Sequence, residues 1–522
     1  MFPNTEPSHD IIRVQKRKRG KKPENLYEEP DIVDINGDFK FLHEPCVGKV
    51  IRKSTRPPLT DADCNPDFIK VKYDDQSDGP FLRKHLNIGS KTPEHICTAI
   101  IALIQEYWCC FAECNVTIPI TGYECFIDTG KGKPTVARNI HYGLHKTPIM
   151  QAAINALLNN KQISVDIHSN WLSKAVLAAK PHQEHVTNIT DFIWRFCINF
   201  IAVNQKTRIL SYFIPRCDDA VKRGFGLAKL FFLLDACSGY HQIIMEKASR
   251  NKTAFAGPYG RKYVYNVMPF GIVNAPTIYT IMIYDLKDSW DSEAIKFEIT
   301  IDENNNSTII IDDNFCYVTS YENGLGYLRA ILTVARRHSL SWKLKKCFVF
   351  PNKVEFVGHD ITDIGNCPAD SKSPLLKSWP KPKIIRDVSS YVSFTLFYSQ
   401  YIPYFEQRSS ALRAIIKTAK TGQDYDIPVT DEMWTEEADA QFHDIRNAIL
   451  SKPILRRVSR QKRCYLLTDF SSVGMGCVLS QPEDTKESID AMKSEDAGGE
   501  CKFEMTLDGP RLLPCSFGSR AC

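Results

Sequence analysis

Two adjacent aspartates interrupt a mainly apolar run at positions 309–318, IIIDDNFCYV. The apolar residues on either side of the pair are typical of two strands, so the pair falls at the tip of a hairpin. Asp and Asn are ordinary turn residues, because their side chains bond the nearby backbone. Alternatively, Asp312 and Asp313 hold a metal ion, since carboxylate oxygens are the ligands that Mg²⁺ prefers. The pair alone leaves both interpretations open.

A third carboxylate, Asp235, ends the apolar run LFFLLD and precedes ACSGYHQI. A side chain directly after a buried strand is held rigidly, and the turn at Ser238-Gly239 lets Tyr240 face the same cleft. The alternative for Asp235 is the amino cap of a helix. Three gathered carboxylates would raise one another's pKa, so such a cluster makes sense only with cations present. Two Mg²⁺ ions about 3.5 to 4 Å apart would stabilise attack of a primer hydroxyl on a nucleotide phosphate.

Length and composition set the broad class. The chain has 522 residues, 43% hydrophobic and 24% charged, which is ordinary for several folded domains. A net charge of +5 is too mild to identify a polyanionic partner. The run QKRKRGKK at 15–22 is more informative, and it fits a solvated tail, a nucleic-acid contact or a nuclear-import signal.

Membrane and disulfide classes are disfavoured. The 18 cysteines include no C-x-x-C pair, so reduced intracellular thiols are expected rather than zinc ribbons. The polar opening MFPNTEPSHD lacks a signal peptide. The apolar stretch 96–111 contains Gln105 and Glu106, so it predicts an amphipathic helix capped by Thr92 rather than a membrane span. We expect a soluble, intracellular chain with no membrane partner.

Strand-like and helical patterns interleave from Trp171 onward. The runs AVLAA, FCINFIAV, LFFLLD and VEFVGHDI predict strands. Leu325, Leu328, Ile331, Leu332 and Ala335 have helical spacing. The chain is mostly helical from Pro368 to about Leu450, and CYLLTDFSSVGMGCVLS then predicts two strands joined by a turn. The fold class is therefore α/β or α+β.

Five motifs follow one another along the chain: LLDACSGYHQI, NKTAFAGPYGRKYVYNVMPFGIVNAP, IIIDDNFCYV, KKCFVF and VEFVGHDIT. Together they resemble the reverse transcriptase of gypsy-type long-terminal-repeat retrotransposons. The resemblance spans roughly residues 120 to 522, and CYLLTDFSSVGMGCVLSQ is similar to the first hairpin of a ribonuclease H domain. It implies an α+β right-hand polymerase with a partial ribonuclease H-like α/β fragment, acting as an RNA-directed DNA polymerase. It also favours metal binding by the aspartate pair over a plain turn.

The resemblance sets the expected domain boundaries. We predict a basic disordered tail at 1–25, an unassigned region with a helical element at 26–125 and the fingers and palm at 126–365. A helical thumb or connection follows at 366–455, and a truncated ribonuclease H-like domain at 456–522.

The resemblance also assigns roles to single residues. Asp235, Asp312 and Asp313 match the catalytic aspartates that bind two Mg²⁺ ions, with Mn²⁺ as a possible substitute. Nucleotide-binding positions are matched by Lys180, Arg195, Tyr240 and Phe270, and primer-positioning positions by Lys346 and Gly358. The ring of Tyr240 would exclude a ribose 2′-hydroxyl by bulk. The implied partners are an RNA or DNA template with its primer and deoxynucleoside triphosphates, and the implied location is a cytoplasmic particle or the nucleus, or both.

Departures from the family pattern keep a second hypothesis open. They are Ile201, Cys237, Ile310, Asn314, Ser393 and Gln400, each at a position where the family commonly has another residue. None of them removes a metal ligand. The alternative is a decayed, catalytically silent retroelement remnant that still binds nucleic acid through phosphate contacts.

Two further carboxylates lie outside these motifs. Asp469, in LLTDFSS, matches the first ribonuclease H carboxylate, but its later partners are absent from the 522 residues, so we expect no ribonuclease H cleavage. Asp128-Thr129-Gly130 is the triplet of aspartic proteases, which need two such carboxylates. The following Lys-Gly-Lys-Pro instead indicates a surface turn.

Overall fold

The computed structural model describes residues 51–52, 86–112, 119–138, 142–179, 194–212, 221, 228–302, 304–311, 313–419, 422, 424–458, 462–470, 474–483 and 512–521. The basic run 15–22, Lys180 and Asp312 lie outside these residues. Within them, no helix combines the length and the apolar character that a membrane crossing requires.

A five-stranded central sheet carries the aspartates, with strand order β11-β12-β7-β13-β2. Its strands are β2 (Asn87–Ile88), β7 (Leu230–Asp235), β11 (Asn306–Ile310), β12 (Asp313–Val318) and β13 (Phe348–Val349). Residues 231–234 of β7 are all buried, which is why LFFLLD shows no alternation. Within the described part of this sheet, the one parallel pair is β13 with β2, so a strand from near residue 87 joins the sheet from far away in the sequence.

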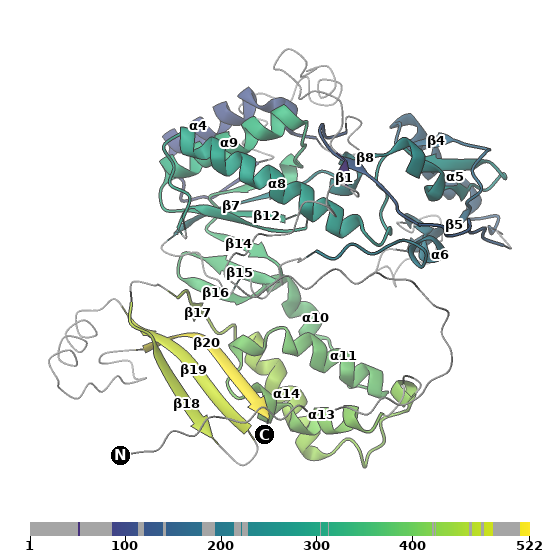
Figure 1. Ribbon diagram of the computed structural model, residues 1–522. Helices are drawn as coiled ribbons and strands as arrows, with labels where there is room; N and C mark the ends of the chain where they lie inside the picture. Colours follow the sequence, from purple (N-terminus) through teal and green to yellow (C-terminus); the bar gives the residue numbers. More distant parts are fainter. Residues whose placement is uncertain are drawn as a thin grey trace, which may run out of the picture. The chain divides into compact units, whose positions relative to one another are not determined.

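Helices α8 (Ala275–Lys296) and α9 (Tyr321–His338) pack on each other and on this sheet (Figure 1). The Ser320 hydroxyl caps α9 by accepting from the N–H of Asn323, and the cationic side chains of Arg336 and Arg337 suit the negative end of the helix dipole. Helix α4 (Glu94–Glu106) and η1 (Trp108–Cys110) pack against α9. The helix predicted at 96–111 is thus present, but its amino cap is Pro93 rather than Thr92.

A second five-stranded sheet has the order β4-β10-β9-β5-β6. Its strands are β4 (Ile163–Val165), β5 (Ser173–Ala179), β6 (Trp194–Asn199), β9 (Phe255–Ala256) and β10 (Lys262–Tyr265). Helix α5 (Thr147–Asn159) contacts β4, and the short α6 (Ile201–Asn204) follows β6. The strand predicted over FCINFIAV therefore ends early, because the Asn199 side chain accepts from the N–H of Ile201 and starts the helix.

Two small sheets flank these. One joins β1 (Ile51–Arg52), β3 (Glu124–Cys125) and β8 (Ile244–Met245). The other has the order β14-β15-β16-β17, formed by β14 (Lys353–Phe356), β15 (His359–Thr362), β16 (Gly365–Pro368) and β17 (Leu455–Arg456). The single strand predicted over VEFVGHDI is wrong. It is a hairpin, because Val357 and Gly358 both adopt positive φ, 48° and 75°, and reverse the chain.

A helical region with its own core follows. It contains α10 (Ser373–Lys377), α11 (Ile385–Leu396), α12 (Phe405–Arg408), α13 (Ser410–Lys417) and α14 (Glu436–Leu450). A final antiparallel sheet has β18 (Tyr465–Phe470), β19 (Gly474–Pro482) and β20 (Leu512–Ala521). The remaining elements are 3₁₀ turns, η2 (Gly239–Gln242), η3 (Lys247–Thr253), η4 (Leu344–Lys346), η5 (Asp370–Lys372), η6 (Ser399–Tyr401) and η7 (Asp424–Asp426).

The attachment of β2 to the central sheet can be tested at Gly89. A Cβ atom there would lie 1.8 Å from the carbonyl oxygen of Phe350, and the Gly89 N–H donates to Val349. We expect Gly89→Ala to lower the free energy of unfolding by about 2 kcal/mol, because backbone must move to relieve the clash. Gly422→Ala is the control, since a Cβ there meets no atom within 4 Å. Urea unfolding with equal midpoints for both variants would contradict this.

Candidate active site

Asp235 and Asp313 face each other across neighbouring strands. Asp235 ends β7 and Asp313 begins β12, and the antiparallel register pairs the two residues directly. Directly opposed residues have Cβ atoms about 4.5 to 5.5 Å apart, so their side chains share one edge of the sheet. Burial first, and then the charge of Asp235, raise the pKa of Asp313. The two carboxylates therefore repel each other and form a natural site for a cation.

The tip between β11 and β12 is a two-residue loop. Ile310 pairs with Asp313, so only Ile311 and position 312 connect the strands. Ile311 has a φ of 52°, which is strained for a β-branched residue. Such strain is typical of functional sites, and here it lies at the tip of the hairpin whose second strand begins at Asp313. Because Asp312 is not among the described residues, the structure brings together two of the three predicted aspartates.

Lys346 lies beside the pair. Its ammonium is 2.9 Å from a carboxylate oxygen of Asp235, and the backbone N–H of Lys343 donates to the Asp235 carbonyl. Lys346 also lowers the pKa of Asp313, whereas Glu355 on β14 raises it. Asp235 is thus a partly buried strand-end carboxylate with a cationic neighbour. The alternative of a helix amino cap is wrong, since the following 3₁₀ turn η2 has Ser238 at its cap position.

The loop after Asp235 turns at Ser238, whose φ is 52°, rather than at Gly239. Gln242 holds this loop in place. Its amide donates to the carbonyls of Cys237 and Ser341, both at 2.9 Å, and its oxygen accepts from the N–H of Ser341 at 2.8 Å. The side chain is completely buried. Sequence reasoning missed Gln242, although a glutamine within an apolar run was a visible signal.

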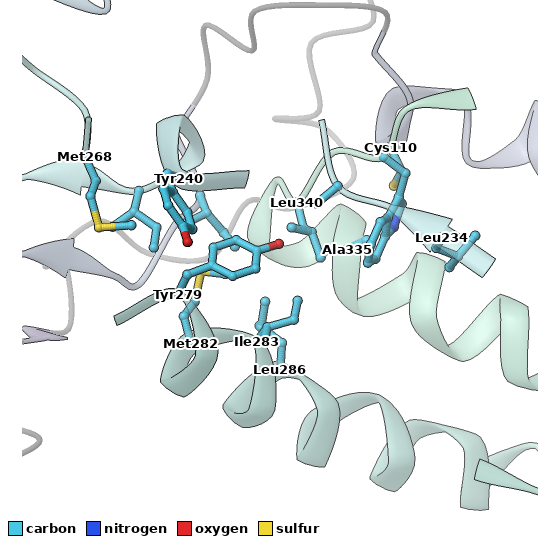
Figure 2. Close-up of a cluster of buried hydrophobic side chains, with 14 of the residues drawn as sticks. Cys110, Leu234, Tyr240, Met268, Tyr279, Met282, Ile283, Leu286, Ala335 and Leu340 are labelled. Atoms are coloured by element: carbon cyan, nitrogen blue, oxygen red, sulfur yellow. The ribbon is translucent and has the colours of Figure 1, made fainter. Parts of the chain in front are cut away.

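Aromatic rings gather where this loop meets α8. Tyr240 is buried, and its ring centroid lies 4.9 Å from that of Phe270 and 5.6 Å from that of Tyr279. Figure 2 shows the rings of Tyr240 and Tyr279 next to each other. Phe270 remains 52% exposed, so it presents a flat apolar face to solvent. His241 contacts the edge of Phe270, and burial lowers the pKa of His241 to about 4, which keeps it neutral. The structure thus brings the predicted pair Tyr240 and Phe270 into contact.

The other predicted residues lie on neighbouring elements. Arg195 is exposed on β6, opposite Ala178 of β5, and no described contact joins it to the carboxylates. Gly358 forms the tip of the β14–β15 hairpin, where its carbonyl accepts from the hydroxyl of Tyr398. Glu355 lies on β14, two residues before the turn of this hairpin. Sequence reasoning missed it because only its charge near Asp313 in the folded chain indicates a role.

Within the described residues, no group of three or more His, Cys, Asp or Glu side chains is arranged to hold a metal ion. The donors that are present nevertheless fit a hard divalent cation. Two opposed carboxylates supply oxygen ligands, and their mutual repulsion is what a cation would relieve. Magnesium keeps several waters and binds through one or two carboxylates plus substrate phosphates, so a pair is a sufficient core.

Asp469 lies in a different setting. It is exposed on β18 and pairs with Gly476 of β19. The ring of Tyr404 covers Gly476, where a Cβ would lie 2.5 Å from it, and the Tyr404 hydroxyl bonds to Asp469, whose charge raises the pKa of Tyr404. The N–H of Glu406 donates to Ser519 of β20. This carboxylate therefore contacts the helical region.

Asp128 forms a turn. One carboxylate oxygen accepts from the N–H of Gly130 at 2.7 Å, and the other lies 3.1 Å from Arg208. This is the turn chemistry typical of aspartate, and it accounts for both oxygens without a second catalytic carboxylate.

Comparison with known proteins identifies the central part of the chain. Residues 191–361 match the family model for reverse transcriptase (RNA-dependent DNA polymerase), and residues 434–496 match the model for the RNase H-like domain found in reverse transcriptase. The chain contains a reverse transcriptase domain. The first match spans β6 to β15 and so includes the strands that bear Asp235 and Asp313.

Relatives of the reverse transcriptase domain are transposon polyproteins. The chain is 24% identical over 432 residues to the retrovirus-related Pol polyprotein from transposon 412 of Drosophila melanogaster, covering 81% of this chain and 33% of that one. It is 28% identical over 298 residues to the Pol polyprotein from transposon opus, covering 56% and 28%. The chain thus spans about a third or less of these relatives.

Solved structures show the same fold. The foamy viral protease-reverse transcriptase in complex with dsDNA has a TM-score of 0.65 at 16% identity, covering 90% of this chain and 82% of that one. The same enzyme with an RNA/DNA hybrid has a TM-score of 0.64 at 16% identity, covering 85% and 52%. The predicted family and the predicted α+β fold of a reverse transcriptase are therefore confirmed.

Proposed function

We propose that this chain is an RNA-directed DNA polymerase that adds deoxynucleotides to a primer 3′-hydroxyl on an RNA or DNA template. The observation that carries the proposal is the direct register of Asp235 with Asp313 at one edge of a buried sheet inside the reverse transcriptase domain. Foamy viral relatives of the same fold have been solved with an RNA/DNA hybrid and with dsDNA. By analogy, this chain acts in a cytoplasmic particle or in the nucleus.

Asp235, Asp313 and Asp312 would hold the divalent ions, Mg²⁺ or Mn²⁺. When bound, such ions stabilise the charge that develops on the attacking and leaving oxygens. The chain's own contribution is to aim two carboxylates at one point and to keep them there through the pairing of β7 with β12. Lys346 neutralises Asp235 in the metal-free arrangement, since their charged groups are 2.9 Å apart.

The nucleotide would lie against Tyr240 and Phe270. The exposed face of Phe270 offers apolar contact, and the packed ring of Tyr240 limits the room beside the sugar. Arg195, together with Lys180, would bind the triphosphate through charge-assisted hydrogen bonds. Lys346 and Gly358 would position the primer end, since Lys346 lies at the carboxylates and Gly358 is the tip of the adjacent hairpin.

Primer extension tests this function. The purified chain, an RNA template with a DNA primer, deoxynucleotides and Mg²⁺ are expected to give extended product, and a chelator should abolish it. The control is the same reaction with the primer ending in a dideoxynucleotide. Retention of duplex binding without any extension would contradict the proposal and would support a silent nucleic-acid-binding remnant.

Substitution of Tyr240 tests the sugar contact. We expect Tyr240→Val to reduce discrimination against ribonucleotides by about 10- to 100-fold, because a smaller side chain leaves room for the 2′-hydroxyl. Tyr240→Phe keeps the ring and should keep the discrimination. Single-nucleotide incorporation of deoxy- and ribonucleotides gives the ratio of kcat/KM values. An unchanged ratio in Tyr240→Val would exclude Tyr240 from this role.

A further inference from the structure

Arg457 reaches the central sheet from a distant part of the chain. It follows β17 directly, and its guanidinium donates to two backbone carbonyls, those of Ala228 and Thr362. It also lies over the ring of Phe231, at 5.0 Å from the centroid. Burial lowers the pKa of Arg457 to about 10, so the side chain remains charged at neutral pH. Both hydrogen bonds are therefore charge-assisted and stronger than neutral ones.

The two carbonyls lie next to or within different sheets. Ala228 lies two residues before β7, the strand that ends in Asp235, and Thr362 ends β15, the strand that starts just after Gly358. A guanidinium has its N–H groups in a fixed planar fork, so it holds two acceptors at a defined separation. Arg457 thus fixes the start of the aspartate strand relative to the β14–β15 hairpin.

An aromatic stack continues this contact toward the carboxylates. Phe231 of β7 stacks on Phe315 of β12 with centroids 5.6 Å apart, and Phe315 stacks on Phe356 of β14 at 4.7 Å. The three rings join the two aspartate strands to the strand that carries Glu355. Phe231 and Asp235 are on the same face of β7, since they are four residues apart, or about 13 Å. Arg457 packs on Phe231 at one end of this stack, and the carboxylates lie toward the other end.

We propose that Arg457 is a positioning residue. It holds the β14–β15 hairpin, whose tip is Gly358, in a fixed position relative to β7 and β12, the strands that carry Asp235 and Asp313. This inference rests on the proposed polymerase function. In that role, Arg457 affects the position of the primer 3′ end and not the binding of the nucleotide. Its loss should therefore slow the chemical step while leaving nucleotide affinity unchanged.

The test compares Arg457→Met with a matched control, Arg456→Met. Arg456 is the neighbouring cation, but it donates to the carbonyl of Ile364 and reaches neither Ala228 nor Phe231. We expect Arg457→Met to lower the maximal rate of single-nucleotide addition by about 10- to 100-fold, because a shift of about 1 Å at the reacting atoms can cost 10²-fold. The nucleotide dissociation constant should change less than about twofold. Arg457→Lys, which keeps the charge but not the fork, should fall between wild type and Arg457→Met.

A readout independent of activity separates this inference from the proposed function. Hydrogen exchange of the amides of β7 and β15 is expected to accelerate in Arg457→Met and not in Arg456→Met. If wild type gives no product, the polymerase proposal fails, and the exchange experiment still decides whether Arg457 couples the two sheets. If Arg457→Met does not fold, Arg457→Lys carries both measurements. Equal rates and equal exchange in the Arg457 and Arg456 variants would overturn the inference.

Discussion

Primer extension by Asp313→Asn is expected to be at least about 10³-fold slower than by wild type, while the protein stays folded. The carboxylate opposes Asp235 at the edge of the central sheet, so it is one of the few oxygens able to hold a divalent ion there. An amide keeps the shape but loses the charge that the ion needs. Losses of this order are typical when one element of transition-state charge stabilisation is removed.

The free energy of unfolding of Asp313→Asn should not fall with its activity and is expected to equal or exceed that of wild type. Burial and the charge of Asp235 raise the folded-state pKa of Asp313 above its unfolded value. The ionised side chain therefore destabilises the metal-free protein once the pH exceeds the unfolded pKa of about 3.9. Asparagine removes this cost. Urea unfolding at neutral pH should show Asp313→Asn as stable as wild type or more so, and any gain should vanish below about pH 4, where both side chains are neutral.

The matched control is Asp128→Asn. Asp128 is a carboxylate that accepts a backbone hydrogen bond and pairs with an arginine, and it lies in the turn described above. We expect its substitution to leave primer extension within about twofold of wild type, because a surface ion pair contributes at most about 1 kcal/mol. Mg²⁺ should raise the unfolding midpoint of wild type and of Asp128→Asn more than that of Asp313→Asn. Equal activity in the two variants would remove Asp313 from the site.

Much of the fold follows from local sequence patterns. LFFLLD predicts β7 because the strand is buried on both faces, and the apolar spacing at 325–335 predicts α9 because one face packs on the sheet. The hairpin at 353–362 was missed because strand-forming residues continue up to its turn, where Val357 follows Phe356 directly. A β-branched residue, Val357, takes positive φ there, which turn propensities disfavour.

Contacts between distant segments could not be predicted in this way. Strand β2 has two residues and no periodicity, and its partner β13 lies about 260 positions later, so nothing local indicates the pairing. At the site, the order of motifs brought Asp235 and Asp313 together correctly. The Lys346 contact with Asp235 and the two carbonyls held by Arg457 depend on side chains that meet only in the folded chain.

Gln242→Leu is expected to lower the free energy of unfolding by about 3 kcal/mol and to reduce activity with it. The leucine leaves the N–H of Ser341 and the carbonyl of Cys237 without the partners that Gln242 supplies, in a place with no solvent access. Each buried group left unpaired costs about 1 to 3 kcal/mol. Because Cys237 lies between Asp235 and Tyr240, loosening it moves both the carboxylate and the ring. Gln162→Leu is the buried control, since its amide makes one long contact of 3.4 Å with His241.

Gln242→Glu separates the hydrogen bonds from the packing. A glutamate fills the same space, but when ionised it would point an oxygen at the two carbonyls to which Gln242 donates. Burial and these acceptors should raise its folded-state pKa above the unfolded value of about 4.3, so stability is lost as the pH rises from that value through the folded pKa. Chemical denaturation at pH 5 and pH 8 should therefore show a larger deficit at pH 8 for Gln242→Glu and a deficit independent of pH for Gln242→Leu. The same dependence in both variants would mean that the cost comes from packing alone and that the amide does not hold the loop.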